Sequence, residues 1–232
     1  MTDSIPVITV DGPSGSGKGM VATHLAEQYG FSLLDSGALY RLVGIAAREA
    51  GFDLDAEAVD ENALAELTEQ LDIAFNPTGD PEDPLVITLL GEDVTRRVRS
   101  DEAGVDASVV AALQGVRDGL TKLQKSFRQK PGLVADGRDM GTVIFPDATV
   151  KIYLTASALA RAERRYNQLK HKDIGVSLLA LLQSIKVRDE RDMSRQASPL
   201  RPADDAHVID STDMTIDEVL NAVQSIVTEK LG

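Results

Sequence analysis

The chain has 232 residues, with 37 Asp and Glu against 24 Lys and Arg, three His and no Cys. Disulfides, thiolate metal sites and a His-rich metal site are therefore excluded, and the net charge of −13 argues against a general grip on nucleic acid. Residues 1–6 carry no export signal and no apolar run of about 18 residues occurs. We expect a cytoplasmic protein without a membrane partner and, without an apolar oligomer stripe, a monomer.

The N-terminal region predicts a strand, a glycine-rich loop and a helix. Residues 5–10 form an apolar run without alternation, which is typical of a strand buried on both faces of a parallel sheet. After the loop at 11–18, apolar residues recur on one helical face. A second short strand is predicted at 31–34, followed by a helix over about 36–50.

The middle of the chain changes character. The acidic residues 53–70 predict a solvent-exposed helix, whereas 71–75 and 85–90 predict strands joined by a turn rich in Pro, Gly and Asp. A further turn is predicted at 91–93. These strands indicate a small antiparallel insert, after which a helical pattern covers 101–129.

The C-terminal half alternates between strands and helices. Strands are predicted at 133–135 and 149–154, followed by two arginine-rich helices, a last strand at 207–209 and an amphipathic helix over about 215–230. This alternation predicts an α/β fold, with a parallel sheet flanked by helices. No linker separates two domains, so residues 1–232 are expected to form a single domain.

Charge is distributed unevenly along the chain. Residues 151–201 carry 11 Lys and Arg against 5 Asp and Glu, whereas the remainder is strongly acidic. A basic island in an acidic protein predicts a small anionic ligand.

The loop after the first strand matches the pattern GxxxxGK. It consists of Gly12, Pro13, Ser14, Gly15, Ser16, Gly17 and Lys18. Glycines let successive backbone N–H groups turn toward one point, where they form a phosphate cradle with the helix N-terminus and the lysine. The alternative is a plain turn. It is the weaker interpretation, because the predicted strand before the loop and the predicted helix after it are the context that a phosphate loop needs.

The position after the lysine holds Gly19, where the general pattern has a Ser or Thr that binds magnesium. Phosphoryl transfer between anionic groups still calls for Mg²⁺, so we expect the ion without assigning its ligands. A GTP-dependent switch would carry a guanine-reading NKxD segment, and none occurs. The sequence also offers a second set of polar residues, beyond those needed for one nucleotide site, which favours an enzyme with two substrates over a switch.

Arginines gather in the two helices predicted after residue 154. Arg188, Arg191 and Arg195 lie three and four residues apart, on one helical stripe with Asp192. A comparable set on the preceding helix consists of Arg161, Arg164 and Arg165. Guanidinium groups bind phosphate oxygens bidentately, so both sets predict phosphate contacts, flanking a segment at 168–175. The alternative is a solvated face with ion pairs such as Arg188 with Asp192.

Three charged residues follow the strand predicted at 133–135. Asp136, Arg138 and Asp139 lie at its carboxyl end, where open α/β sheets bind ligands. Charged groups are costly to bury there unless they are paired. We interpret the segment as part of a ligand site, with an Asp- and Gly-rich turn as the alternative.

Taken together, several segments resemble those of the bacterial cytidylate kinase family, nearly from end to end. They are residues 10–19, 34–41, 91–94, 136–142, 145–148, 188–192 and 209–212. The resemblance implies the P-loop fold of nucleoside monophosphate kinases and transfer of the ATP γ-phosphate, with Mg²⁺, to CMP or dCMP. It also implies a monophosphate-binding insert over 63–105 and a helical, arginine-rich lid over 157–195.

The resemblance further implies roles for individual residues. The acceptor phosphate would be held by Arg41, Arg138 and Arg195, and the sugar would be contacted by Arg188 and Asp192. The base would be read by Ser108, Arg117 and Asp139, with Ser36 in the same pocket. The residues implied to act in catalysis are Lys18, Arg138, Arg188 and Arg195. ATP would be bound by residues 12–18 together with Gly19, Met20 and Arg164.

The chemistry of cytosine agrees with the role of Asp139. The exocyclic amine of cytosine is a donor that a carboxylate accepts, whereas uracil presents an oxygen that the carboxylate repels, so we expect discrimination against UMP. Met20 departs from the family, which often has threonine there, so a hydroxyl near the phosphates is missing. A kinase for UMP, AMP or shikimate and a non-catalytic ATP-binding regulator are the alternatives.

Overall fold

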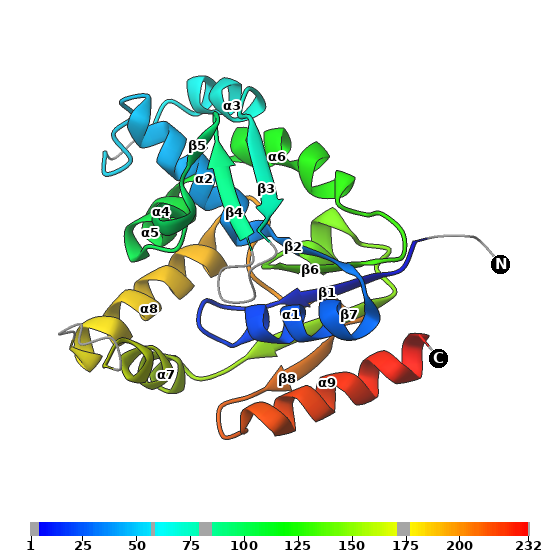
Figure 1. Cartoon of the computed structure of the whole chain (residues 1–232). Coiled ribbons are helices and arrows are strands. Elements are labelled where there is room, and N and C mark those ends of the chain that lie inside the picture. Colours follow the sequence, from blue (N-terminus) through cyan, green and yellow to red (C-terminus); the bar gives the residue numbers. More distant parts are fainter. Residues whose placement is uncertain (1–4, 57–58, 79–84, 171–176, 232) are drawn as a thin grey trace. The chain divides into compact units, whose positions relative to one another are not determined.

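Figure 1 shows a computed structural model of the chain, which describes residues 5–56, 59–78, 85–170 and 177–231. The chain forms two compact units. Unit 1 comprises Met1–Asp35 and Gln124–Gly232, and unit 2 comprises Ser36–Leu123. The predicted insert therefore falls within unit 2 and the predicted lid within unit 1, although residues 79–84 of the first and 171–176 of the second lie outside the described residues.

Unit 1 is built on a five-stranded sheet in which all strands run parallel. Their order is β2 (Ser32–Asp35), β6 (Leu133–Gly137), β1 (Val7–Asp11), β7 (Val150–Thr155) and β8 (His207–Asp210). The inner strands β1 and β6 are buried along their whole length, as expected from their apolar runs, whereas the edge strands β2 and β8 each bury one residue. The predicted parallel α/β fold is confirmed.

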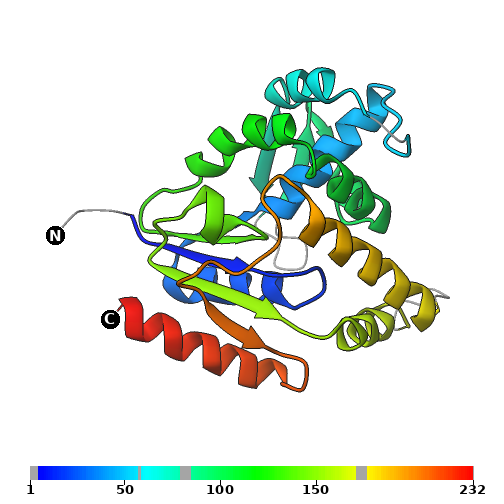
Figure 2. The same cartoon turned by 180° about the vertical axis from the view of Figure 1, so that it is seen from behind.

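The helices of unit 1 are α1 (Lys18–Tyr29), the π-helix η1 (Met140–Ile144), α7 (Ala158–Lys170), α8 (Leu178–Ser194) and α9 (Ile216–Leu231). The helices α1 and α9 share one apolar core with the sheet, to which β1 contributes Ile8 and Val10. The arginine-rich α7 and α8 pack against each other and lie side by side in Figures 1 and 2.

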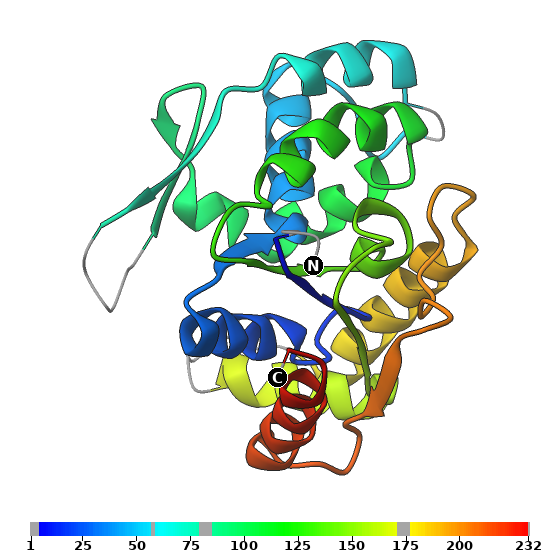
Figure 3. The same ribbon diagram turned by 90° about the vertical axis from the view of Figure 1, so that its right-hand side faces the viewer.

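Unit 2 combines helices with a small antiparallel sheet, as predicted. Its strands are β3 (Ile73–Pro77), β4 (Leu85–Leu89) and β5 (Glu92–Asp93), and its helices are α2 (Ser36–Glu49), α3 (Glu61–Glu69), α4 (Thr95–Val98), α5 (Asp101–Val110) and α6 (Gln114–Ser126), which continues beyond the unit. Figure 3 shows β3 and β4 as a ribbon beside the helices of the unit. The close packing of α2 on α5 requires Gly44, because a Cβ there would lie 2.8 Å from the Cβ of Asp106.

Two element boundaries in unit 2 were wrongly predicted. The helix expected over 53–70 is shorter, because Asp60 accepts a hydrogen bond from the Ala63 N–H (3.1 Å) and so caps α3 at Glu61. The turn expected at 91–93 lies earlier, at Leu90 and Gly91, which have positive φ angles of 51° and 84°. The two residues after this turn pair with β4 as the short strand β5.

The single helix expected over 101–129 is also wrong, because the chain forms α5 and α6 with a break at residues 111–113. Arg117 stabilises the end of α5, since its guanidinium donates to the carbonyl of Ala111 (3.1 Å). The residues at the break are Ala, Ala and Leu, so no Gly or Pro marks the end of the helix in the sequence.

Candidate active site

The glycine loop joins β1 to α1 through left-handed backbone conformations. Gly12, Gly15 and Gly17 have φ angles of 153°, 77° and 95°. A Cβ on Gly12 would lie 2.1 Å from the carbonyl oxygen of Leu154, so only glycine fits there. Gly17 precedes α1 without a side-chain cap, and no acidic residue lies in the first turn. The first N–H groups of α1 can therefore bind an anion.

Lys18 and Asp136 form a buried pair next to this loop. The Lys18 Nζ donates to the Pro13 carbonyl (3.4 Å) and lies 3.9 Å from Asp136 Oδ1. Burial lowers the pKa of Lys18, an effect that Asp136 opposes. Burial likewise raises the pKa of Asp136, and Lys18 opposes that shift. A bound phosphate would add negative charge beside Lys18 and stabilise its cationic form.

Two arginines of α7 anchor the loop through its backbone. Arg161 donates to the Ser14 carbonyl (2.9 Å) and pairs with Asp189 (3.0 Å), while Arg164 donates to the Ser16 carbonyl (3.5 Å). Arg161 is only 4% exposed. The donors of Arg161 hold protein carbonyls and a carboxylate, and the phosphate contact expected for it stays a prediction. Sequence reasoning did not single out Asp189, whose partner lies on the neighbouring helix.

Aspartates lie at the carboxyl ends of the central strands. Asp11 is the last residue of β1, and the register of β2 and β6 places Asp35 beside Asp136. Burial raises the pKa of Asp11 to about 7, although hydrogen bonds from the backbone N–H groups of Gly141 and Met140 act to lower it. Sequence reasoning missed Asp11, whose only signal is a polar residue at the end of an apolar strand.

The donors beside Lys18 fit a magnesium ion held mainly by phosphate oxygens and water. In the described ranges, no group of three or more His, Cys, Asp and Glu side chains could hold a metal by itself. The Ser16 hydroxyl is buried and has no hydrogen-bond partner among the residues that the structure describes, and Asp136 supplies a carboxylate. Mg²⁺ in phosphate-binding sites typically takes one or two carboxylates and otherwise phosphate and water.

A second charged cluster joins the end of β6 to α8. Arg138 donates through Nε to the carboxylate of Asp192, and the two side chains are 15% and 2% exposed. Although burial acts to raise it, the pKa of Asp192 is held below its ordinary value by Arg138, and further by Arg188 and Arg195. Asp192 therefore does not lie on a solvated face, and three of the predicted arginines surround it.

The turn after α8 fixes Arg195 next to this cluster. The Arg195 Nε donates to the Ser198 carbonyl (2.7 Å), and the Leu200 N–H donates to the Asp192 carbonyl (2.8 Å). Ser198 adopts a positive φ of 47°, which is uncommon outside glycine. The backbone after α8 thus pays a conformational cost to hold Arg195 in this orientation.

Asp139 follows Arg138 and immediately precedes η1. Its side chain is buried, with an exposure of 2%, and makes no capping hydrogen bond to η1. The backbone carbonyl of Asp139 accepts hydrogen bonds from Val143 (2.9 Å) and Ile144 (3.2 Å). Asp139 is thus a buried acidic residue at the carboxyl end of a central strand, where open α/β sheets bind ligands.

The remaining predicted substrate residues belong to unit 2. Ser36 is buried as the first residue of α2, and Ser108 is buried on α5. Arg41 donates to the carbonyls of Val98 (2.9 Å) and Ser100 (2.7 Å). Arg117 is 4% exposed, with its guanidinium 5.5 Å from the centroid of the Tyr40 ring. The packing of α2 on α5 therefore orients Ser36, Arg41 and Ser108 within this unit.

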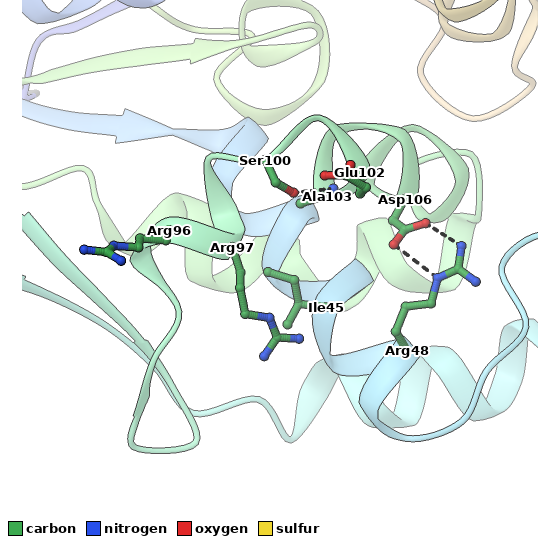
Figure 4. A pocket seen from close by; sticks show the side chains of 8 residues that line it. All are labelled: Ile45, Arg48, Arg96, Arg97, Ser100, Glu102, Ala103 and Asp106. Atoms are coloured by element: carbon green, nitrogen blue, oxygen red, sulfur yellow. Dashed lines mark hydrogen bonds and ion pairs between the residues drawn. The ribbon is translucent and has the colours of Figure 1, made fainter. Parts of the chain in front are cut away.

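Unit 2 also has a hollow with a volume of about 420 Å³, and none of the predicted site residues lines it. It is lined by Ile45, Arg48, Arg96, Arg97, Ser100, Glu102, Ala103 and Asp106 (Figure 4). Arg48 is engaged by Asp106 (2.8 Å) and Arg97 by Glu49. Since carboxylates neutralise these guanidinium groups, the hollow is a poor match for a phosphate.

Comparison with known proteins identifies the family. Residues 8–229 match the family described as cytidylate kinase. This chain belongs to the cytidylate kinase family. A protein of Stutzerimonas stutzeri (strain A1501) named cytidylate kinase is 54% identical over 99% of this chain and 98% of its own. Proteins of the same name from Aeromonas salmonicida (strain A449) and Shewanella sp. (strain MR-4) are 51% and 49% identical over the whole chain, covering 98% and 99% of their own lengths.

The family membership confirms the resemblance on which the residue roles were expected. Those roles themselves, including Met20 and Arg164 at the ATP site, stay predictions. In the part of the chain that the structure describes, every helix is too short or too polar to cross a membrane.

Proposed function

We propose that this protein transfers the γ-phosphoryl group of ATP to CMP or dCMP, giving ADP and CDP or dCDP. The observation that carries the proposal is the match of residues 8–229 to the cytidylate kinase family. The glycine loop and the buried arginine cluster of unit 1 support it, because they provide positive charge and N–H donors where anionic groups would have to meet.

The triphosphate would lie on the glycine loop. The N–H groups of residues 12–18 and the start of α1 would bind its oxygens, and Lys18 would neutralise the β- and γ-phosphates. Arg161 would act indirectly by fixing the Ser14 carbonyl, whereas Arg164 also has its guanidinium at the loop. The rigid loop would then receive the phosphates without reorganising.

Magnesium, when bound with ATP, would neutralise charge on the phosphates, with Asp136 and the Ser16 hydroxyl as the protein groups that would hold it or its water shell. Gly19 and Met20 offer no hydroxyl for this purpose.

The acceptor phosphate would be aligned by Arg138 and Arg195, and the same role expected for Arg41 stays a prediction. One of its oxygens attacks the γ-phosphorus while the bond from that phosphorus to the β-phosphate oxygen breaks, and ADP leaves with the electron pair. An acceptor phosphate is already an anionic nucleophile, so the enzyme needs no strong base. Arg188 would neutralise the charge that spreads over the transferring group.

Selection of cytosine would depend on Asp139. Its carboxylate, buried at the start of η1, would accept the exocyclic amine. The base-reading roles expected for Ser36, Ser108 and Arg117 stay predictions. Uracil would place an oxygen against the same carboxylate. The Arg138–Asp192 pair would set the sugar and phosphate contacts beside it. A cytoplasmic location, a monomeric state and a lid over 157–195 stay predictions.

A coupled assay of ADP release tests this proposal. We expect release to depend on CMP or dCMP and to be far slower with UMP, AMP or shikimate. Uracil and shikimate lack the exocyclic amine that Asp139 would accept, and adenine presents its amine on a larger purine ring. Preference for one of the other acceptors would replace the proposed substrate. ATP binding without any acceptor-dependent release would favour the non-catalytic regulator.

A further inference from the structure

The strand β1 carries two polar side chains on one face. Residues alternate between the faces of a strand, so Ile8 and Val10 enter the core with α1 and α9, whereas Thr9 and Asp11 point to the opposite face. Thr9 is fully buried and Asp11 is 5% exposed. The segment that contacts β1 on this face includes η1.

The carboxylate of Asp11 caps η1 from a distant part of the chain. Its two oxygens accept hydrogen bonds from the backbone N–H groups of Met140 (2.9 Å) and Gly141 (2.8 Å), 129 and 130 residues away. These are the first two N–H groups of η1, and both would be costly to bury without an acceptor.

The close approach of η1 to β1 depends on glycine. A Cβ on Gly141 would lie 2.8 Å from the Thr9 Oγ1 and 3.2 Å from the Lys151 Cδ. Any larger residue would therefore push the N–H of residue 141 away from Asp11. The two hydrogen bonds therefore depend on the close packing of η1 against β1.

Asp139 occupies the position from which an aspartate ordinarily caps a helix. Asp is among the preferred residues immediately before a helix, because its side chain accepts from the first-turn N–H groups. Here Asp139 makes no such bond, and Asp11 accepts those protons instead. Asp11 therefore caps η1 in place of the residue that immediately precedes it.

We propose that Asp11 is a positioning residue for base recognition, which caps η1 so that the carboxylate of Asp139 is not drawn into that cap and stays oriented toward the nucleobase. This inference rests on the proposed function, because it assigns Asp139 to the cytosine amine. Asp11 itself touches neither substrate in this proposal and acts through Asp139.

A double-mutant cycle tests the coupling. Asp11→Asn, Asp139→Asn and the double variant are compared for kcat/KM with CMP and with UMP, and for ATP affinity by calorimetry. We expect Asp11→Asn to lower the CMP to UMP preference roughly tenfold, about the worth of one hydrogen bond, with ATP affinity nearly unchanged. In the Asp139→Asn background the same substitution should not change the preference further.

The outcomes separate the two proposals. If Asp139→Asn leaves the preference intact, Asp139 does not read the base and both proposals about it fail. If Asp139→Asn abolishes the preference and Asp11→Asn leaves it unchanged, the positioning role of Asp11 alone is overturned. An equal effect of Asp11→Asn in both backgrounds would also overturn it, because a purely structural defect does not depend on Asp139.

Two further variants guard against a failure of Asp11→Asn to fold. Gly141→Ala approaches the same contact from η1 and should lower the preference for CMP, whereas an unchanged preference would contradict the proposal. Thr9→Val is the matched control on the same face of β1, since its hydroxyl is buried without a hydrogen-bond partner in the described residues. It should retain the preference, and a loss equal to that of Asp11→Asn would overturn the specific role of the cap.

Discussion

The ion pair of Arg138 with Asp192 in unit 1 and that of Arg97 with Glu49 in unit 2 join the same chemical groups in different surroundings. The side chains of the first pair are 15% and 2% exposed, and those of the second are 49% and 42% exposed. A buried ion pair seldom adds net stability over apolar residues, yet it is costly to break, whereas an exposed pair contributes little either way. The difference teaches that a buried pair at a strand end is better explained by ligand binding than by stability.

The largest effect should follow from breaking the buried pair. We expect Arg138→Met to lower the free energy of unfolding by about 3 kcal/mol, because it leaves the Asp192 carboxylate buried without its main partner. CMP-dependent ADP release should be lost as well. Urea denaturation and the coupled assay measure the two effects, and a stability loss below about 1 kcal/mol would mean that Asp192 is solvated after all.

Arg188 sharpens the comparison because its charge acts on Asp192, whereas Arg138 is the main partner of that carboxylate. For Arg188→Met we expect a loss of about 100-fold in kcat, since charge developing on the transferring phosphoryl group would lose a stabilising guanidinium. Lys186→Met, an exposed cation on the same helix, serves as the control and should be close to wild type. Near-normal turnover of Arg188→Met would return that arginine to the solvated-face interpretation.

Asp11 provides a pH-dependent test of burial in unit 1. Its pKa is raised to about 7, so the native state holds this proton between the ordinary pKa and that value while the unfolded state does not. The stability that results is present at low pH and is lost as pH rises through about 7. The unfolding free energy of the wild type relative to Asp11→Asn should therefore fall by about 2 to 3 kcal/mol from about pH 5 to about pH 8.

Urea denaturation of both proteins across this pH range provides the measurement. The Asn side chain does not titrate, so it provides a reference without the charge change at position 11. The other acidic groups are the same in both proteins and largely cancel in the difference. A difference that stays constant or grows with pH would contradict the raised pKa, and would show that the N–H groups of Met140 and Gly141 outweigh the burial of Asp11.

The smallest effect is expected at the exposed pair. Arg97→Met should change the free energy of unfolding by less than about 1 kcal/mol, because water screens the charge of Arg97 and Glu49. It should also leave CMP turnover unchanged. A loss comparable to that of Arg138→Met would erase the contrast between the two pairs.

Periodicity and turn chemistry were sufficient to predict most elements of the fold. The apolar runs of β1, β6 and β7 and the glycine loop before α1 were recognisable because each depends on neighbouring residues. The break between α5 and α6 was not, since Arg117 caps α5 through its side chain and no Gly or Pro marks the site. Local signals thus failed where a side chain from the next helix decides the boundary.

The sequence by itself determined the family, the phosphate loop and the residue types that make a kinase site. Each of these depends on a short segment whose neighbouring residues act together. Only the tertiary structure decided how the charges are partnered. Arg161 donates to a loop carbonyl, Arg138 pairs with Asp192, and Asp11 caps η1 across 129 residues of chain. The physical reason is that a buried charge takes its partner from whatever the fold brings within hydrogen-bond distance, and sequence spacing does not encode that distance.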